Sequence, residues 1–367
     1  MSIRVFVLGI SLVGFTAANL KSQEIEASTL SFNDIARFVA GKPLSPTSRL
    51  RPLLNQLSVQ EHYHETAALS KKWEESRLAA IRQWALTDIQ PQIPQPATVK
   101  YMFGGPDFIH VATIFPGAPE YILVGLEPLG SIPNFLSMTE EELNTFLDHL
   151  NHTLRSISRR NFFITTEMRE DFGKNGVDGV FPVLLYFAAL NGHQVIDASY
   201  VKLDSQGEPV VSDQAGATGI WLRLFDEGGG YNEQNLYYFL TDLSNNGFRG
   251  GSSFHQFLSA RPHSIGYLKA ASYLMHTENF TNIRNFLVTD CQFILQDASG
   301  IPAEFLSLYY QLTFYGNYVG PIDMFSEYDQ PWLHEAYRSG AARTLPFGTG
   351  YRMRDDESIQ LFGTRKE

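Results

Sequence analysis

Residues 121–125 read YILVG, an apolar run without a charged side chain that lies between Pro119 and Pro128. A strand that is apolar on both faces must be covered on both faces, which is typical of a central strand in a sheet flanked by helices. Amphipathic helical patterns alternate with strand-like runs along the rest of the chain, and this alternation predicts an α/β protein. We therefore expect an α/β fold with mixed sheets and flanking helices.

Two stretches carry the pattern of an amphipathic helix. In residues 57–85, Ser58 and Glu61 have the spacing of a capping box, and apolar side chains recur at helical spacing. A second capping box, Thr139 with Glu142, precedes another amphipathic pattern. Both stretches are predicted to be helices that begin at these caps.

Two further stretches are apolar enough to be buried. Residues 180–190 fit a buried strand or a buried helix, and periodicity does not separate these alternatives. Residues 254–276 have a helical pattern. We expect a helix for the second stretch and leave the first open.

The order of these patterns divides the chain into four parts. Prolines 91, 94 and 96 end the first helical stretch, and residues 205–218 are rich in turn formers. Similar patterns follow in similar order on either side of this second boundary, which indicates two diverged internal repeats. The predicted parts are a signal peptide (1–22), a helical segment with a proline-rich linker (23–98), a first α/β half (99–204) and a second α/β half with a C-terminal tail (205–367).

The amino terminus predicts export. Arg4 precedes an apolar run over residues 5–18, and small and polar residues follow, as in a secretory signal peptide. This run is shorter than the roughly 20 residues of a spanning helix, and no later segment reaches that length. We therefore predict an exported protein, periplasmic or secreted, without a transmembrane span after the signal; an uncleaved anchor remains the alternative.

Charge and cysteine content narrow the class of protein further. The formal net charge of −11 argues against a nucleic-acid partner, because phosphate binding needs clustered basic residues. Cys291 is the only cysteine, so an intramolecular disulfide and a cysteine-rich zinc site are both excluded. This combination indicates a bacterial protein of the cell envelope.

Acidic side chains and one histidine lie where strand-like runs meet turns. Asp107 and His110 would meet if their segment turns, but they would point to opposite faces of a straight strand. Glu127 lies between an apolar run and Pro128, where a partly desolvated carboxylate can act as general acid or base. Asp242 ends another strand-like run. Such groups line ligand sites at the carboxyl edge of α/β sheets, although each acid could instead cap its own turn.

Other candidate groups point to structural roles. Asp297, followed by Ala, Ser and Gly, fits an Asx turn or a helix cap. His62 and His64 are two residues apart and do not face each other on a helix, so we expect a solvated helix face rather than a zinc site. A divalent metal held by residues distant in sequence remains open. The chain has no nucleotide cofactor motif, and the glycines at 228–230 are flanked by acids that repel phosphate.

Four stretches resemble a family of exported bacterial proteins of unknown function: GGPDFIHVATIFPGAPEYILVGLEPLG (104–130), ASYLMH with NFTNIRNFLV (271–276 and 279–288), ILQDASGIP (294–302) and LPFGTGY (345–351). The resemblance extends over roughly residues 95–352. It implies export and a bacterial source, and it implies no activity and no site residues.

Two functions are compatible with these residues. The favoured one is a non-catalytic binding role in the cell envelope, for glycan or protein, through exposed aromatic side chains. The alternative is a cell-envelope hydrolase in which Glu127 is general base or metal ligand, Asp107 and His110 bind a cation or orient water, and Asp242 contributes. The binding role predicts that these four side chains lie apart on local amides, and the hydrolase predicts that they converge.

Overall fold

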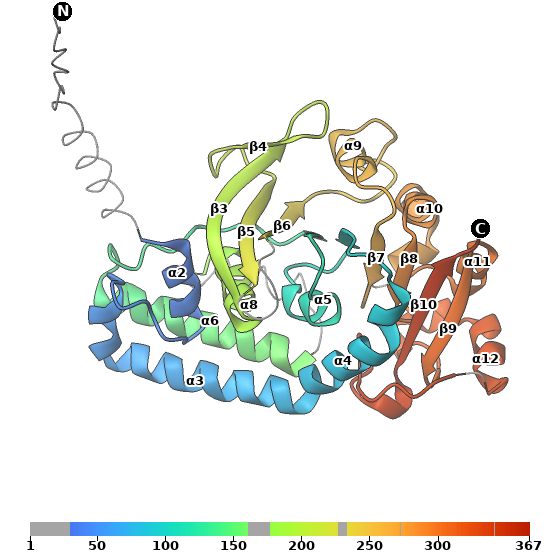
Figure 1. Ribbon diagram of the computed structural model, residues 1–367, viewed down its shortest axis with the longest axis horizontal. Coiled ribbons are helices and arrows are strands. Elements are labelled where there is room, and N and C mark those ends of the chain that lie inside the picture. The colour runs from blue at the N-terminus through green and yellow to red at the C-terminus, as the bar shows by residue number, and fades with distance from the viewer. Residues whose placement is uncertain (1–29, 161–176, 227–232, 272, 341) are drawn as a thin grey trace, which may run out of the picture.

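A mixed sheet of ten strands organises the molecule (Figure 1). The computed structural model describes residues 30–160, 177–226, 233–271, 273–340 and 342–367. Within them, the strand order is β4-β3-β5-β6-β2-β1-β7-β8-β10-β9. The central strands β6, β2, β1, β7 and β8 are parallel, and the strands outside them are antiparallel to their neighbours. The predicted α/β class with a mixed sheet and flanking helices is confirmed.

The elements have the following bounds. The strands are β1 (Val99–Tyr101), β2 (Glu120–Gly125), β3 (His193–Leu203), β4 (Pro209–Val211), β5 (Gly219–Asp226), β6 (Glu233–Leu240), β7 (Ile265–Leu268), β8 (Phe293–Gln296), β9 (Tyr310–Gly316) and β10 (Ile359–Arg365). The α-helices are α2 (Phe32–Val39), α3 (Leu57–Trp73), α4 (Ala79–Trp84), α5 (Phe108–Ile114), α6 (Glu140–Arg160), α8 (Phe181–Leu190), α9 (Ser253–Ser259), α10 (Thr281–Asp290), α11 (Ala303–Tyr309) and α12 (Pro331–Arg338). The shorter helical turns are η1 (Arg51–Asn55), η2 (Glu74–Leu78), η3 (Ala85–Ile89), η4 (Gln90–Gln92), η5 (Leu274–His276), η6 (Glu278–Phe280), η7 (Asp323–Tyr328) and η8 (Asp355–Glu357).

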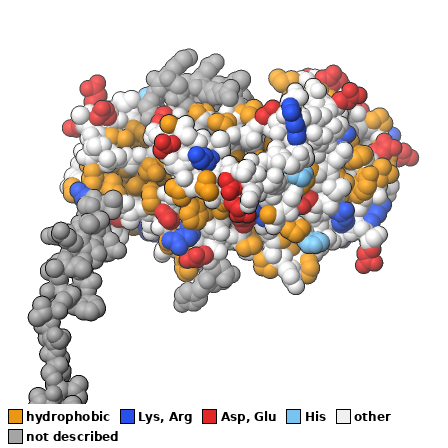
Figure 2. All heavy atoms as spheres, turned by 90° about the horizontal axis from the view of Figure 1, so that it is seen from above, with side chains coloured by type: hydrophobic (Ala, Val, Ile, Leu, Met, Phe, Trp, Pro, Cys, Tyr) orange, Lys and Arg blue, Asp and Glu red, His pale blue; other side chains and the backbone are white. Residues whose placement is uncertain are grey.

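None of the helices in these described ranges has the length and apolar character needed to cross a membrane. Seen from above, the surface carries acidic and basic side chains scattered among hydrophobic ones (Figure 2). This face therefore has no uniform basic patch.

Strand β2 is central and covered on both faces, as its continuous apolar run predicts. Tyr121 and Leu123 belong to the larger core, which packs under α2, α3, α4, α5, α6 and α8. Ile122 and Val124 belong to a second core, which includes side chains of α9 and α10. Alternate residues of one strand thus fill two separate cores.

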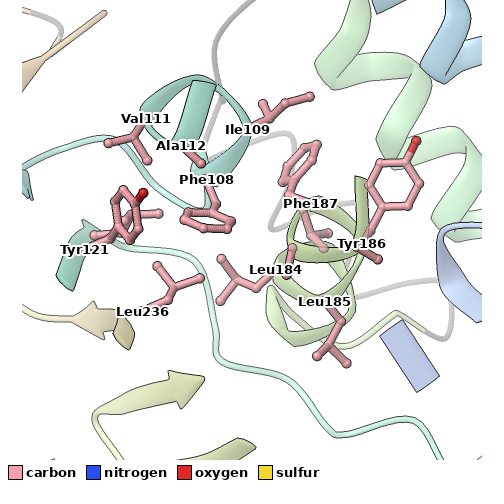
Figure 3. Packing of buried hydrophobic residues seen from close by; sticks show 14 of the residues in the cluster. Phe108, Ile109, Val111, Ala112, Tyr121, Leu184, Leu185, Tyr186, Phe187 and Leu236 are labelled. Atoms are coloured by element: carbon pink, nitrogen blue, oxygen red, sulfur yellow. The ribbon is translucent and has the colours of Figure 1, made fainter. Parts of the chain in front are cut away.

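Helices α5 and α8 pack side by side within the larger core (Figure 3). The ring of Phe108 on α5 lies 5.1 Å from that of Tyr121 on β2, at a steep angle. Residues 181–189 of α8 are buried on every side. A helix that is apolar all round needs such complete coverage, and this explains why periodicity could not distinguish it from a strand.

The first predicted helix exists, but it begins differently. Its N-cap residue is Gln56, which makes no side-chain cap, so the predicted capping box at Ser58 is wrong. The helix continues through the π-helical turns η2 and η3 to η4. At the second capping box the prediction is confirmed: the Thr139 amide donates to Glu142 Oε2 at 2.7 Å, and the Glu142 amide donates to Thr139 Oγ1 at 3.2 Å.

The predicted solvated face around His62 is also wrong for that residue. His62 is fully buried, with Nδ1 2.7 Å from Asn151 Oδ1 on α6 and Nε2 3.0 Å from the Val39 carbonyl on α2. His62 thus connects α2, α3 and α6. His64 is exposed, as expected. The paired ring nitrogens give His62 a structural role.

The predicted single helix over residues 254–276 is wrong. Helix α9 ends at Ser259, and Ile265–Leu268 forms β7 between β1 and β8. An added Cβ at Gly266 would lie 3.2 Å from the Cys291 sulfur, so the strand packs closely against the chain that leads into β8. Pairing with neighbours far away in sequence has overridden the local helical pattern.

Strands from both predicted α/β halves contribute to the one sheet. β2 from the first half lies between β1 and β6, and β6 comes from the second half. The division into domains and the internal duplication stay predictions. The predicted signal peptide lies outside the described residues.

Candidate functional site

The connections of the sheet reverse direction between β1 and β7. β1 leads to β2 on one side, whereas β7 lies on the other side and leads outward to β8. In open α/β sheets, such a switch point opens a crevice outside the carboxyl ends of the strands, where ligands bind. The loops that follow Tyr101 and Leu268 flank this crevice.

A buried ion pair joins these two loops. Lys269, which directly follows β7, places its Nζ 2.6 Å from Asp107 Oδ2. Both side chains are almost completely buried, with exposures of 1% and 0%. The Tyr101 hydroxyl, at the end of β1, donates to the same carboxylate oxygen at 2.8 Å. Because neither charge is solvated, the pair holds the walls of the crevice together.

Asp107 and His110 meet because the chain turns at Asp107. Asp107 is the N-cap of α5, and His110 lies in the first turn of that helix. The His110 Nδ1 lies 2.7 Å from Asp107 Oδ1 and 3.1 Å from Lys269 Nζ. The conditional prediction that these residues lie close together if the segment turns is confirmed, and the straight strand that would separate them is excluded.

Two groups compete for Nδ1 of His110. The Asp107 carboxylate oxygen at 2.7 Å favours a proton on Nδ1, which leaves Nε2 as the acceptor, whereas the Lys269 ammonium at 3.1 Å can only donate to Nδ1. In the described part of the chain, Nε2 has no hydrogen-bond partner, and the side chain keeps 9% exposure. In the tautomer with the proton on Nδ1, His110 has the arrangement of a base whose orientation is set by an acid.

Burial and charge shift the pKa values of this cluster. Burial alone would raise the pKa of Asp107, but the adjacent His110 and Lys269 outweigh burial and lower that pKa to about 2. Burial lowers the pKa of His110, and Asp107 opposes the shift only in part. Burial likewise lowers the pKa of Lys269. Asp107 is therefore ionised and His110 neutral at neutral pH.

Glu127 is buried, as predicted, and its carboxylate accepts hydrogen bonds from groups close to the end of β2 and on β6. Its Oε2 accepts from the Leu126 amide at 3.1 Å and from the Tyr238 hydroxyl at 3.0 Å. An added Cβ at Gly125 would overlap this carboxylate, and one at Gly105 would lie 3.3 Å from it. The two glycines therefore let the chain close around Glu127, beside the loop that carries Asp107.

Asp242 and Asp297 both cap turns, as the structural alternative predicts. Asp242 accepts from the Ser244 amide at 2.8 Å and from its hydroxyl at 2.9 Å. Asp297 accepts from the Ser299 amide at 2.9 Å. It also accepts from the Ala270 amide at 2.9 Å, which links the end of β8 to the loop after β7. Asp297 thus stabilises one wall of the crevice.

A cavity of about 170 Å³ opens at this edge of the sheet. Glu127 and Asp242 line it, whereas Asp107 and His110 do not. Two further lining residues, Phe103 and Ala270, have φ values of 62° and 51°. Left-handed backbone at residues other than glycine is strained, and such strain gathers at ligand sites.

A larger cavity lies elsewhere. It measures about 590 Å³ and is lined by residues of α3, α4 and α5, together with His193 and Asp226. His193 pairs with Asp226 at the end of β5. Because β5 is antiparallel to β6, the end of β5 lies beside the start of β6, and this cavity lies toward the amino ends of the parallel strands. It contains none of the four predicted site residues.

The described residues contain no group of three or more His, Cys, Asp and Glu side chains that could hold a metal ion. The chain matches no family model, no curated protein and no solved structure.

Sequence reasoning did not identify Lys269 and Tyr101. Lys269 falls within the stretch that was expected to be helical, so its position at the end of a strand was hidden. The available signal was the apolar run at 265–268, which follows Pro262 and ends at a single basic residue. Tyr101 had no distinguishing local signal among 17 tyrosines.

Proposed function

We propose that this protein binds a small molecule in the cavity at the carboxyl ends of β1, β2, β6 and β7. The observation that carries the proposal is the Asp107–Lys269 pair, which joins two loops across the switch point. Strain at Phe103 and Ala270 supports it, because each such residue costs about 1–3 kcal/mol and persists only where the structure around it is fixed.

A small ligand suits this molecule better than a broad glycan or protein surface. Sugar stacking uses exposed aromatic rings. Among the described residues, the large hydrophobic side chains that are exposed are aliphatic apart from Tyr309. Many aromatic side chains are instead buried in the core, as Phe108 and Tyr121 are.

Methyl NMR tests this proposal. Leucine-labelled protein is titrated with a library of small polar compounds, and the methyl groups of Leu126, Leu243 and Leu274 report on the cavity they line. We expect some compounds to shift these signals while the exposed Leu57 and Leu308 stay unchanged. A library that leaves the three cavity leucines unmoved would contradict the proposal.

Export is the second part of the proposal. The signal-like residues 1–22, the single cysteine and the resemblance to exported bacterial proteins support it. Expression of the full chain in a bacterium should yield a periplasmic or secreted product that lacks about the first 22 residues. Mass spectrometry of an uncleaved cytoplasmic product would contradict export.

Catalysis is the second candidate, and the Asp107–His110 contact favours it. With Nδ1 bound to Asp107, Nε2 could take a proton from water or a hydroxyl group, as in a hydrolase. Lys269 would keep the carboxylate ionised while His110 changes charge.

Paired variants test this candidate on a panel of ester, amide and glycoside substrates. His110→Gln should abolish hydrolysis, and His64→Gln, at an exposed histidine on α3, should not change it. Hydrolysis that survives in His110→Gln, or a panel without any hydrolysis in the parent protein, would leave binding as the better account.

A further inference from the structure

The larger cavity, toward the amino ends of the parallel strands, has a hydrophilic wall. Its volume of about 590 Å³ falls within the range of about 300–1,000 Å³ that is usual for small-molecule sites. Its described lining residues include no Phe, Tyr or Trp. Hydroxyl and amide side chains line it instead, from Thr66, Ser70, Thr113 and Asn191. The cavity therefore suits a polar compound rather than one with a large apolar surface.

A π-helical turn shapes one side of this cavity. The turn η2 runs between α3 and α4, and its first and last residues, Glu74 and Leu78, both line the cavity. Turns of this kind are rare and are frequent at functional sites. The Arg82 guanidinium donates to the two Glu74 carboxylate oxygens at 2.8 and 3.1 Å. The charge of Glu74 is therefore offset within the wall itself.

The same wall carries donors that the described residues leave without an acceptor. Lys42 Nζ makes no hydrogen bond or ion pair with any described residue. Lys71 Nζ lies 3.8 Å from Glu75 Oε1, which is too long for a hydrogen bond. The Nδ2 of Asn191 is buried and has no partner among the described residues. A buried donor without an acceptor is costly, so a ligand that accepts hydrogen bonds would satisfy it.

The ends of two helices add acceptors for hydroxyl groups. Helix α2 has its C-cap at Ala40 and helix α8 has its C-cap at Asn191, and both residues line the cavity. The last carbonyl groups of a helix lack partners within the helix and accept hydrogen bonds from other donors. Hydroxyl groups, which both donate and accept, match a wall that has uncommitted donors as well as helix carbonyls.

We propose that this cavity binds a small organic anion that carries hydroxyl groups, such as a sugar acid. The ammonium groups of Lys42 and Lys71 hold its anionic group, and Asn191 accepts it among polar side chains. Basic charge is in excess, because Glu74 is offset by Arg82 and Asp226 is the only other acid among the described lining residues. This site is separate from the cavity at the carboxyl ends of the strands and does not depend on a ligand there.

Three linear six-carbon probes test the inference: D-gluconate, sorbitol and hexanoate. Sorbitol keeps the hydroxyl groups without the charge, and hexanoate keeps the charge without the hydroxyl groups. Each is titrated into leucine-labelled protein, and the methyl shifts of Leu78 and Leu190, which line this cavity, give the affinity. Gluconate should bind about tenfold more tightly than either of the other two, because charge-assisted hydrogen bonds are stronger than neutral ones and the wall is polar.

Lysine variants assign the charge preference to the cavity. Lys42→Gln and Lys71→Gln should each weaken gluconate about threefold, and the double variant about tenfold, while sorbitol binds as before. Lys72→Gln removes the same charge from the next residue of α3, which is exposed and does not line the cavity. It should leave the affinity for gluconate unchanged.

The outcomes separate this inference from the proposed function. Gluconate that binds no more tightly than sorbitol or hexanoate overturns the hydroxylated anion. An equal loss in Lys72→Gln and Lys71→Gln also overturns it, because such a loss reflects the net charge of the protein and not a site. If no probe moves Leu78 and Leu190, the inference fails, whereas the proposed function is judged by the leucines of the other cavity.

Discussion

At the scale of single residues, the Asp107–Lys269 pair is the most consequential feature. Each charge is buried, and each depends on the other for compensation. His110 adds a polar contact on one side of the carboxylate, and the Tyr101 hydroxyl adds one on the other. The cluster therefore behaves as one unit, and the loss of one member leaves the remaining polar groups buried without a partner.

Asp107→Asn should lower the free energy of unfolding by about 3–5 kcal/mol, because it leaves the Lys269 charge buried without a partner. The double variant Asp107→Asn/Lys269→Met should recover part of this loss. Urea denaturation measures both, with Asp213→Asn at an exposed turn as the control. An Asp107→Asn variant as stable as the control would show that the pair is not the junction described above.

The stability of the protein should fall on acidification. Because the pKa of Asp107 is lowered to about 2, its contribution is complete above the unfolded pKa of about 4 and is lost as pH falls toward about 2. This loss should be about 2 kcal/mol. The lowered pKa of His110 also makes stability fall on acidification. In the unfolded chain His110 takes up a proton below about pH 6.5, whereas in the folded protein it does so only at lower pH.

Urea denaturation at a series of pH values checks the Asp107 contribution. The variant Asp107→Asn lacks the titrating group, so its stability should change less between pH 4 and pH 2. Identical pH dependence in the two proteins would contradict the assigned role of Asp107.

At the scale of elements, local signals predicted much of the structure and failed where pairing was distant. The capping box at Thr139, the central strand at 121–125 and the turn at Asp107 each follow from neighbouring residues. β7 does not, because Ile265–Leu268 becomes a strand only through pairing with β1 and β8. Lys269, the partner of Asp107, was missed for the same reason.

The two capping boxes give a matched comparison. Thr139→Ala should lower the free energy of unfolding by about 1 kcal/mol, because the Thr139 hydroxyl accepts from the first turn of α6. Ser58→Ala should have little effect, because α3 is capped at Gln56 without a side-chain bond. Thermal or urea unfolding compares them, and an equal loss in both variants would contradict the observed start of α3.

At the scale of the whole molecule, the candidate site arises from strand order. Asp107 and His110 could be predicted as a pair, and Glu127 as a buried carboxylate, from the residues around them. The switch point between β1 and β7 depends on pairing between strands about 165 residues apart, which no local pattern encodes. The sequence therefore predicts several residues of the crevice but not the crevice itself.

Crystals of the protein soaked with small polar fragments test the central claim most directly, because two cavities compete for the fragments. We expect fragments to gather in the cavity lined by Phe103, Glu127 and Ala270. Fragments that fill only the larger cavity near His193 and Asp226, and never the switch point, would contradict it.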